Sequence, residues 1–172
     1  LVMVNALNKG YGLFDKIIQY CFYDRANASA VESNWGLLNC WQRGYTDNAE
    51  AELTPNGAKK SYLGVAAMNY FTGGNTEFLE MIKSNNDRAY MFKFRNDNMR
   101  KNVMLCINGF LRMPTEKTVA LDTNKVKIYD KYGNFVKEMT SETGNFKFSV
   151  TAEPMYVTWP LEGEEDENEN GN

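Results

Sequence analysis

The sequence contains no histidine, and this absence excludes several kinds of chemistry. Without an imidazole the chain cannot build a Ser-His-Asp or Cys-His catalytic site, a histidine general base or a histidine-ligated zinc site. The three cysteines, Cys21, Cys40 and Cys106, are scattered and form no CxxC pair, so neither zinc nor redox chemistry is indicated. We therefore expect no metal and no cofactor, buried thiols, and acid–base chemistry only from Asp, Glu, Lys or Tyr.

Long apolar runs and a strong excess of one charge are also lacking. No stretch of about 18 apolar residues occurs, so the sequence predicts no transmembrane helix and no membrane partner. Residues 162–172, EGEEDENENGN, hold six of the 22 acidic residues and no basic one, so the remaining chain has 16 acidic against 19 basic residues. This mild excess argues against a nucleic-acid partner. We expect residues 162–172 to be a disordered acidic tail.

The first residues, LVMVN, lack the basic segment of a signal peptide. They resemble the interior of a longer protein more than a natural start. The compartment therefore stays unknown from the sequence.

Residues 1–23 predict a helix followed by a strand. Leu1, Val4 and Leu7 have helical spacing, and the Gly-Tyr-Gly at residues 10–12 ends the helix. Residues 16–23, KIIQYCFY, are β-branched and aromatic with little charge, which is typical of a buried strand in a parallel sheet.

A long polar segment, residues 24–53, separates this strand from a second helix. A loop of this length usually has a function. Thr54 and Pro55 begin the helix, because threonine can cap it and proline suits the first helical position. The helix is predicted to end at Gly73-Gly74. Its core-facing stripe is predicted to comprise Tyr62, Val65, Ala66 and Tyr70.

After Gly74 the periodicity changes from helical to alternating. Short strands separated by polar or glycine turns are typical of a sandwich or barrel. The turn at residues 130–134, DKYGN, places Gly133 where a positive φ is needed. Residues 78–82 fit a helix or a strand, and we favour a strand because it extends the meander. The other predicted strands are 89–95, 103–107, 118–121, 126–129, 135–139, 146–150 and 155–159.

The chain therefore divides into two halves. Residues 1–74 form a strand-loop-helix unit, and residues 75–161 form an antiparallel β-sandwich. A lone parallel strand needs neighbouring strands on both sides. We therefore predict an α+β fold in which residues 1–74 are the end of a (β/α)8 barrel that begins before Leu1.

The chain resembles the C-terminal part of clan-A retaining glycoside hydrolases, in particular the β-xylosidase / α-L-iduronidase-like family. The matching segments are the strand and loop IIQYCFYDRANASAVESNWGLL, the helix LTPNGAKKSYLGVAAMNYFTGG, and the sandwich segments AYMFKFRND, KNVMLCIN, VKIYDKYGN and EPMYVTWP. Together they cover about residues 15–160. The resemblance implies a TIM barrel followed by a β-sandwich.

In such enzymes two glutamates act as acid/base and nucleophile, at the ends of the fourth and seventh barrel strands. The resemblance places both strands before Leu1, so it implies no catalytic residue in this chain. The remaining acids, such as Glu50, Glu52, Glu77 and Glu80, have no spacing that pairs them. We therefore expect the parent protein to be a hydrolase and this fragment to be inactive.

The loop after the predicted last barrel strand supplies candidate substrate-binding residues, namely Glu32, Trp35, Asp24 and Arg25. Carboxylates and arginine can hydrogen-bond sugar hydroxyls, and tryptophan can stack on a sugar ring. Plainer explanations are an Asp24–Arg25 ion pair, a Glu32 bond within its own loop, and Trp35 packing. Trp41 and Tyr45 are weaker candidates, and the sequon at residues 27–29 is a common chance pattern.

The expected partners are an oligo- or polysaccharide and the remainder of the parent chain, in a secreted, periplasmic or cell-surface protein. Two alternatives remain. One is a non-catalytic carbohydrate-binding or appendage module. The other is a structural or partner-binding domain with an apolar flank that invites self-association.

Overall fold

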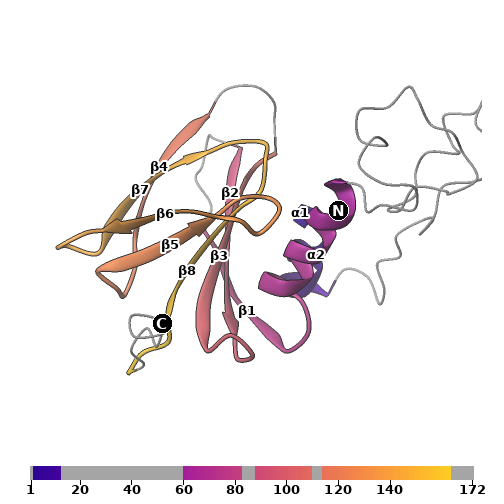
Figure 1. Ribbon diagram of the computed structural model, residues 1–172, viewed down its shortest axis with the longest axis horizontal. Coiled ribbons are helices and arrows are strands. Elements are labelled where there is room, and N and C mark those ends of the chain that lie inside the picture. Colours follow the sequence, from indigo (N-terminus) through magenta and orange to yellow (C-terminus); the bar gives the residue numbers. More distant parts are fainter. Residues whose placement is uncertain (1, 13–59, 83–87, 110–113, 164–172) are drawn as a thin grey trace, which may run out of the picture.

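The computed structural model describes residues 2–12, 60–82, 88–109 and 114–163 (Figure 1). The predicted strand 16–23, the loop 24–53, the start of the second helix and residues 164–172 lie outside these ranges. The described part contains two helices and eight strands. They are α1 (Val2–Tyr11), α2 (Lys60–Thr72), β1 (Thr76–Ile82), β2 (Ala89–Asn96), β3 (Lys101–Asn108), β4 (Thr115–Ala120), β5 (Lys125–Tyr129), β6 (Phe135–Thr140), β7 (Asn145–Val150) and β8 (Met155–Pro160).

The first helix, α1, forms as predicted and ends at Tyr11, between Gly10 and Gly12. The amide of Gly12 donates to the Asn8 carbonyl at 2.8 Å, and Gly12 has a φ of 60°. This left-handed residue satisfies a carbonyl that the helix end would leave unpaired. Gly10 lets α1 approach β1 closely, because a Cβ there would lie 2.7 Å from the ring of Phe78.

The second helix, α2, buries a different face from the one predicted. Its buried residues include Ala67, Met68 and Phe71, whereas Ala66 is exposed and Tyr70 is 65% exposed. The predicted stripe through Ala66 and Tyr70 is therefore wrong. Small and apolar residues surround this helix on all sides, so their spacing alone did not identify the buried face.

The end of α2 at its glycine pair is confirmed. Gly73 donates its amide to the Asn69 carbonyl at 2.9 Å, and Gly74 follows with a φ of 55°. The left-handed residue after the last turn stops the helix and sends the chain into β1.

The strands pair into a six-stranded antiparallel sheet and a two-stranded one. The larger sheet has the order β1-β2-β3-β8-β5-β6, and β4 pairs with β7. All seven clearly predicted strands are present, and residues 78–82 belong to a strand, as favoured. Gly133 has a φ of 84° in the turn between β5 and β6, as predicted.

The six-stranded sheet is buried on both faces near its centre, as β3 shows. Met104 and Cys106 face a core shared with β4 and β7, while Val103 and Leu105 face a core shared with α1 and α2. In Figure 1 the helices accordingly lie on one side of the large sheet and β4 and β7 on the other. The prediction of an α+β fold with a β-sandwich is confirmed in this form. The barrel end and the boundary at residue 74 stay predictions.

Candidate functional site

The residues predicted to contact substrate all lie outside the described part of the chain. Asp24, Arg25, Glu32 and Trp35 belong to residues 13–59, as do the weaker candidates Trp41 and Tyr45. Their roles stay predictions.

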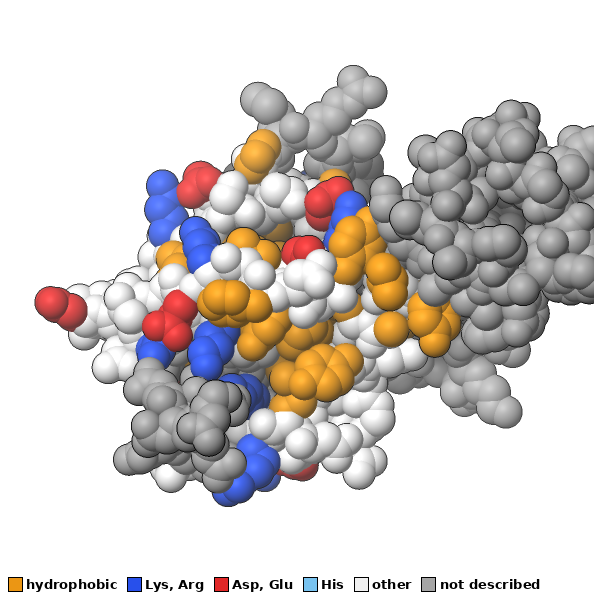
Figure 2. Space-filling model, viewed as in Figure 1, with side chains coloured by type: hydrophobic (Ala, Val, Ile, Leu, Met, Phe, Trp, Pro, Cys, Tyr) orange, Lys and Arg blue, Asp and Glu red, His pale blue; other side chains and the backbone are white. Residues whose placement is uncertain are grey.

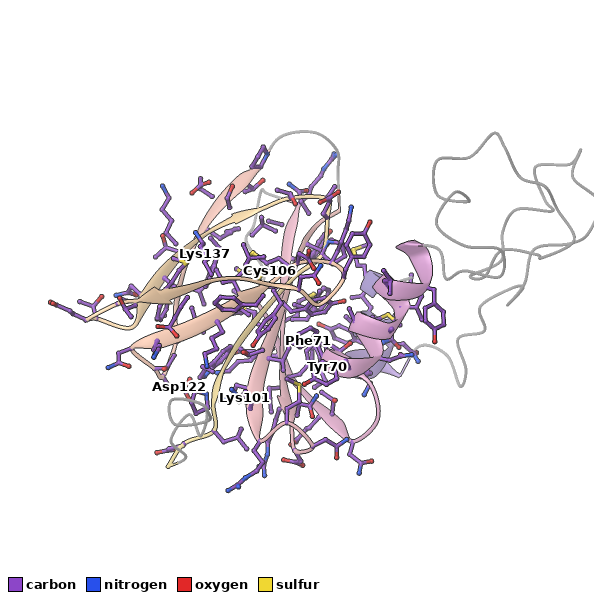
Figure 3. The ribbon with its side chains drawn as sticks, viewed as in Figure 1. Tyr70, Phe71, Lys101, Cys106, Asp122 and Lys137 are labelled. Carbon is purple, nitrogen blue, oxygen red and sulfur yellow. The ribbon has the colours of Figure 1, made fainter. Side chains whose placement is uncertain are left out.

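The central feature of the described part is a row of aromatic side chains at the junction of α2 with the sheet. Phe71 stacks on Tyr156 with ring centres 4.5 Å apart and an angle of 18°, and its centre lies 5.1 Å from that of Tyr129. Tyr129 in turn lies 5.9 Å from Phe135, and Phe71 lies 5.1 Å from Tyr70. Figure 3 labels Phe71 and Tyr70 where α2 meets the sheet. This aromatic row runs from exposed Tyr70 through buried Phe71 to Phe135, which is 58% exposed.

Asn96 at the end of β2 holds the last turn of α2 against the sheet. Its amide nitrogen donates to the carbonyls of Tyr70 and Phe71, at 3.1 and 3.0 Å. Its side-chain oxygen accepts a bond from the amide of Met99 at 3.1 Å. A buried asparagine thereby satisfies helix-end carbonyls that would otherwise lack a partner. Nothing in the local sequence indicated this contact, because 25 residues separate Asn96 from Phe71.

The turn between β5 and β6 supports α2 from the other side. Asp130 accepts bonds from the amides of Tyr132 and Asn134, at 2.8 and 2.9 Å. The turn places Gly133 so that a Cβ there would lie 3.5 Å from Ala67 and 3.7 Å from Phe71. The aromatic row is therefore fixed by a helix cap on one side and a turn on the other.

Two buried hydroxyls on β8, those of Tyr156 and Thr158, have no hydrogen-bond partner among the residues that the structure describes. They lie on the same face of the strand because they are two residues apart. Burial raises the pKa of the Tyr156 phenol, which keeps it neutral. Tyr156 is fully buried and stacks on Phe71, so it is a packing residue.

The described carboxyl groups with shifted pKa values are unsuited to general acid catalysis. A glycosidase acid needs a raised pKa. A hydrogen bond from Ser149, followed by one from Lys147, lowers the pKa of Glu116. Burial alone would raise the pKa of Asp130, but hydrogen bonds, first from Asn134, bring it below its usual value.

Burial raises the pKa of the unpaired Cys106 thiol, which makes it inert as a nucleophile. Within residues 2–12, 60–82, 88–109 and 114–163, no group of three or more His, Cys, Asp or Glu is placed to hold a metal ion. Neither described helix is long and apolar enough to cross a membrane.

The described structure thus defines an α+β protein with a β-sandwich and a helical layer. No protein family description and no curated protein matches the sequence. Similar folds occur among solved structures. A family 39 glycoside hydrolase from the gut symbiont Bacteroides cellulosilyticus WH2 is 18% identical with a TM-score of 0.56. The glycoside hydrolase family 30 subfamily 8 xylanase Xyn30A from Clostridium acetobutylicum is 13% identical with a TM-score of 0.50.

These matches cover most of this chain but only a small part of the enzymes. They span 79% and 62% of this chain, against 24% and 29% of the family 39 and family 30 structures. At this identity the likeness concerns the fold alone. The resemblance to clan-A glycoside hydrolases that the sequence indicated is confirmed at that level.

Proposed function

We propose that this chain is the C-terminal portion of a glycoside hydrolase, with the catalytic glutamates upstream of Leu1. The observation that supports this proposal is the unequal coverage of the family 39 fold match, 79% of this chain against 24% of the enzyme. On this proposal the sandwich supports the barrel, and the 172 residues alone do not hydrolyse glycosides. Residues 1–74 supply the last strand and helix of the barrel, with Glu32 and Trp35 at the rim of its site.

The outer side of the helical layer carries exposed apolar side chains, as expected if it packs against the rest of a barrel. On α2, Leu63 is 45% exposed and Tyr70 is 65% exposed, and on α1 Val4 is 40% exposed. Figure 2 shows hydrophobic side chains at the right of this face, over the region of α2. A globular chain gains stability by covering such side chains. The missing part of a barrel would cover them in the proposed parent enzyme.

The test is a hydrolysis assay on a broad panel of aryl-glycosides and xylo-oligosaccharides. The full-length gene product is expected to release product from at least one glycoside, and the isolated 172 residues from none. A full-length protein that is inert on the whole panel would contradict the proposal. So would hydrolysis by the isolated chain.

A non-catalytic carbohydrate-binding or appendage module is the second candidate. It is favoured by Phe135, which is 58% exposed at the end of the aromatic row and could stack on a sugar ring. Affinity electrophoresis on a series of polysaccharides tests this candidate. Retardation that is lost in Phe135→Ala, Trp35→Ala or Trp41→Ala but kept in Val136→Ala would support it. No retardation on any polysaccharide would remove it.

A further inference from the structure

Strand β6 is an edge of the six-stranded sheet, and a register shift places an aromatic ring and a carboxylate on the same face of it. On this strand Phe135 lies opposite Tyr129, and Glu138 lies opposite Lys127. Tyr129 and Lys127 are two residues apart on β5 and share a face, so their partners share it too. Without the register shift at Tyr129, Phe135 and Glu138 would face opposite sides, because they are three residues apart.

The helical layer leaves this part of the sheet uncovered. The core that the sheet shares with α1 and α2 includes Tyr129 of β5 but no residue of β6. Figure 1 shows β6 leading away from the helices toward the left of the sheet. Phe135 is accordingly 58% exposed, and its ring centre lies 5.9 Å from that of Tyr129 at an angle of 73°. This edge-to-face contact holds the Phe135 ring in place and leaves ring surface open to a ligand.

Glu138 supplies a hydrogen-bond acceptor beside this ring. One of its oxygens lies 3.3 Å from the ammonium nitrogen of Lys125, and its side chain is 36% exposed. A carboxylate has about four acceptor positions, so an ion pair with one lysine leaves it able to accept further bonds. Neighbouring positions on one face of a strand lie about 7 Å apart. The aromatic ring and the carboxylate therefore stand side by side along the strand.

We propose that Phe135 and Glu138 bind an uncharged oligosaccharide at this edge of the sheet. A pyranose with equatorial hydroxyls presents C–H groups to an aromatic ring and hydroxyl groups around its rim. It can therefore stack on Phe135 and donate a hydrogen bond to Glu138 at the same time. An apolar protein segment on this face would remove the pair of Glu138 and Lys125 from water, which is costly. This inference rests on the carbohydrate role proposed above.

Nuclear magnetic resonance of the 172-residue chain, titrated with xylo- and cello-oligosaccharides, tests the site. The amide signals of Phe135 and Glu138 should shift until they saturate, whereas that of Lys147 on the two-stranded sheet should not. Phe135→Ala should weaken binding about 10-fold because it removes the stacking surface. Glu138→Ala should weaken it about 3- to 10-fold because it removes the acceptor.

Two matched controls separate this site from general effects of the substitutions. Val136→Ala shortens another exposed apolar side chain of β6, and Glu116→Ala removes an exposed carboxylate that is paired with Lys147. Both variants should bind as the original chain does. Equal losses of affinity in Phe135→Ala and Val136→Ala would overturn the proposal, and so would equal losses in Glu138→Ala and Glu116→Ala.

The remaining outcomes also decide the question. No saturable shift at Phe135 and Glu138, in a chain whose spectrum shows that it is folded, would overturn the proposal. Shifts of these signals that grow with protein concentration and without saccharide would assign the face to a second copy of the chain and overturn it as well. If the full-length gene product hydrolyses glycosides while the chain shows no binding, only this site is removed. If the chain binds while the full-length product is inert, only the glycosidase assignment is removed.

Discussion

Asp130 stabilises the turn between β5 and β6 through its side chain. It accepts bonds from the amides of Tyr132 and Asn134 and from the Asn134 side chain, at 2.8, 2.9 and 3.0 Å. We expect Asp130→Ala to lower the free energy of unfolding by about 1–2 kcal/mol, because these donors lose their acceptor. Asp97→Ala is the matched control, because its exposed pair with Arg95 contributes about 0–1 kcal/mol. Urea denaturation measures both, and equal losses would contradict the account.

The same residue predicts a dependence on pH. Hydrogen bonding in the fold lowers the pKa of Asp130, so its carboxylate binds a proton less readily than in the unfolded chain. This stabilisation is complete above the ordinary aspartate pKa of about 3.9 and is lost as pH falls through the lower folded value. The difference in unfolding free energy between the original chain and Asp130→Asn should therefore be smaller at acid pH than at neutral pH. A difference in unfolding free energy that is the same at acid and neutral pH would contradict the claim that the Asp130 carboxylate stabilises the fold.

At the scale of single elements, two glycines with positive φ allow the cost of backbone strain to be compared with the cost of a steric clash. A Cβ on Gly144 would lie 2.6 Å from the Leu121 carbonyl oxygen, whereas at Gly163 it would meet nothing within 4 Å. Both have positive φ, 71° and 82°. Gly144→Ala should cost about 2 kcal/mol or more and Gly163→Ala about 1 kcal/mol, since only the first adds a clash to the strain. Thermal denaturation of the two variants compares them, and equal losses would show that the β6–β7 turn adapts.

The strands were predictable because alternation and turn chemistry are local properties. The hairpin glycine Gly133 and the helix end at Gly74 follow from single-residue backbone preferences. The buried face of α2 was not predictable, because Ala66 and Ala67 are equally suited to burial and only the sheet decides between them. The cap by Asn96 was also missed, since it joins segments far apart in sequence. The predicted sugar contacts at Glu32 and Trp35 lie outside the described part and stay predictions.

At the scale of the whole molecule, α2 and the sheet share one core and should unfold together. Phe71 is 1% exposed and stacks on Tyr156, whereas its neighbour Tyr70 is 65% exposed. We expect Phe71→Ala to lower the free energy of unfolding by about 3–5 kcal/mol. Tyr70→Ala should change it by about 0.5 kcal/mol or less. Circular dichroism followed through denaturation in the far and near ultraviolet should give one coincident transition. Separate helix and sheet transitions would contradict a shared core.

The central claim is that the outer side of the helical layer is covered by the rest of a larger enzyme. Thiol labelling of Tyr70→Cys, with the site identified by peptide mapping, tests this claim most directly. The exposed Val136→Cys serves as control, because Val136 is 54% exposed on the edge strand β6. In the 172-residue chain both introduced thiols should react quickly. In the full-length gene product the account predicts that Tyr70→Cys is protected while Val136→Cys still reacts. Equally fast labelling of Tyr70→Cys in both proteins would contradict it.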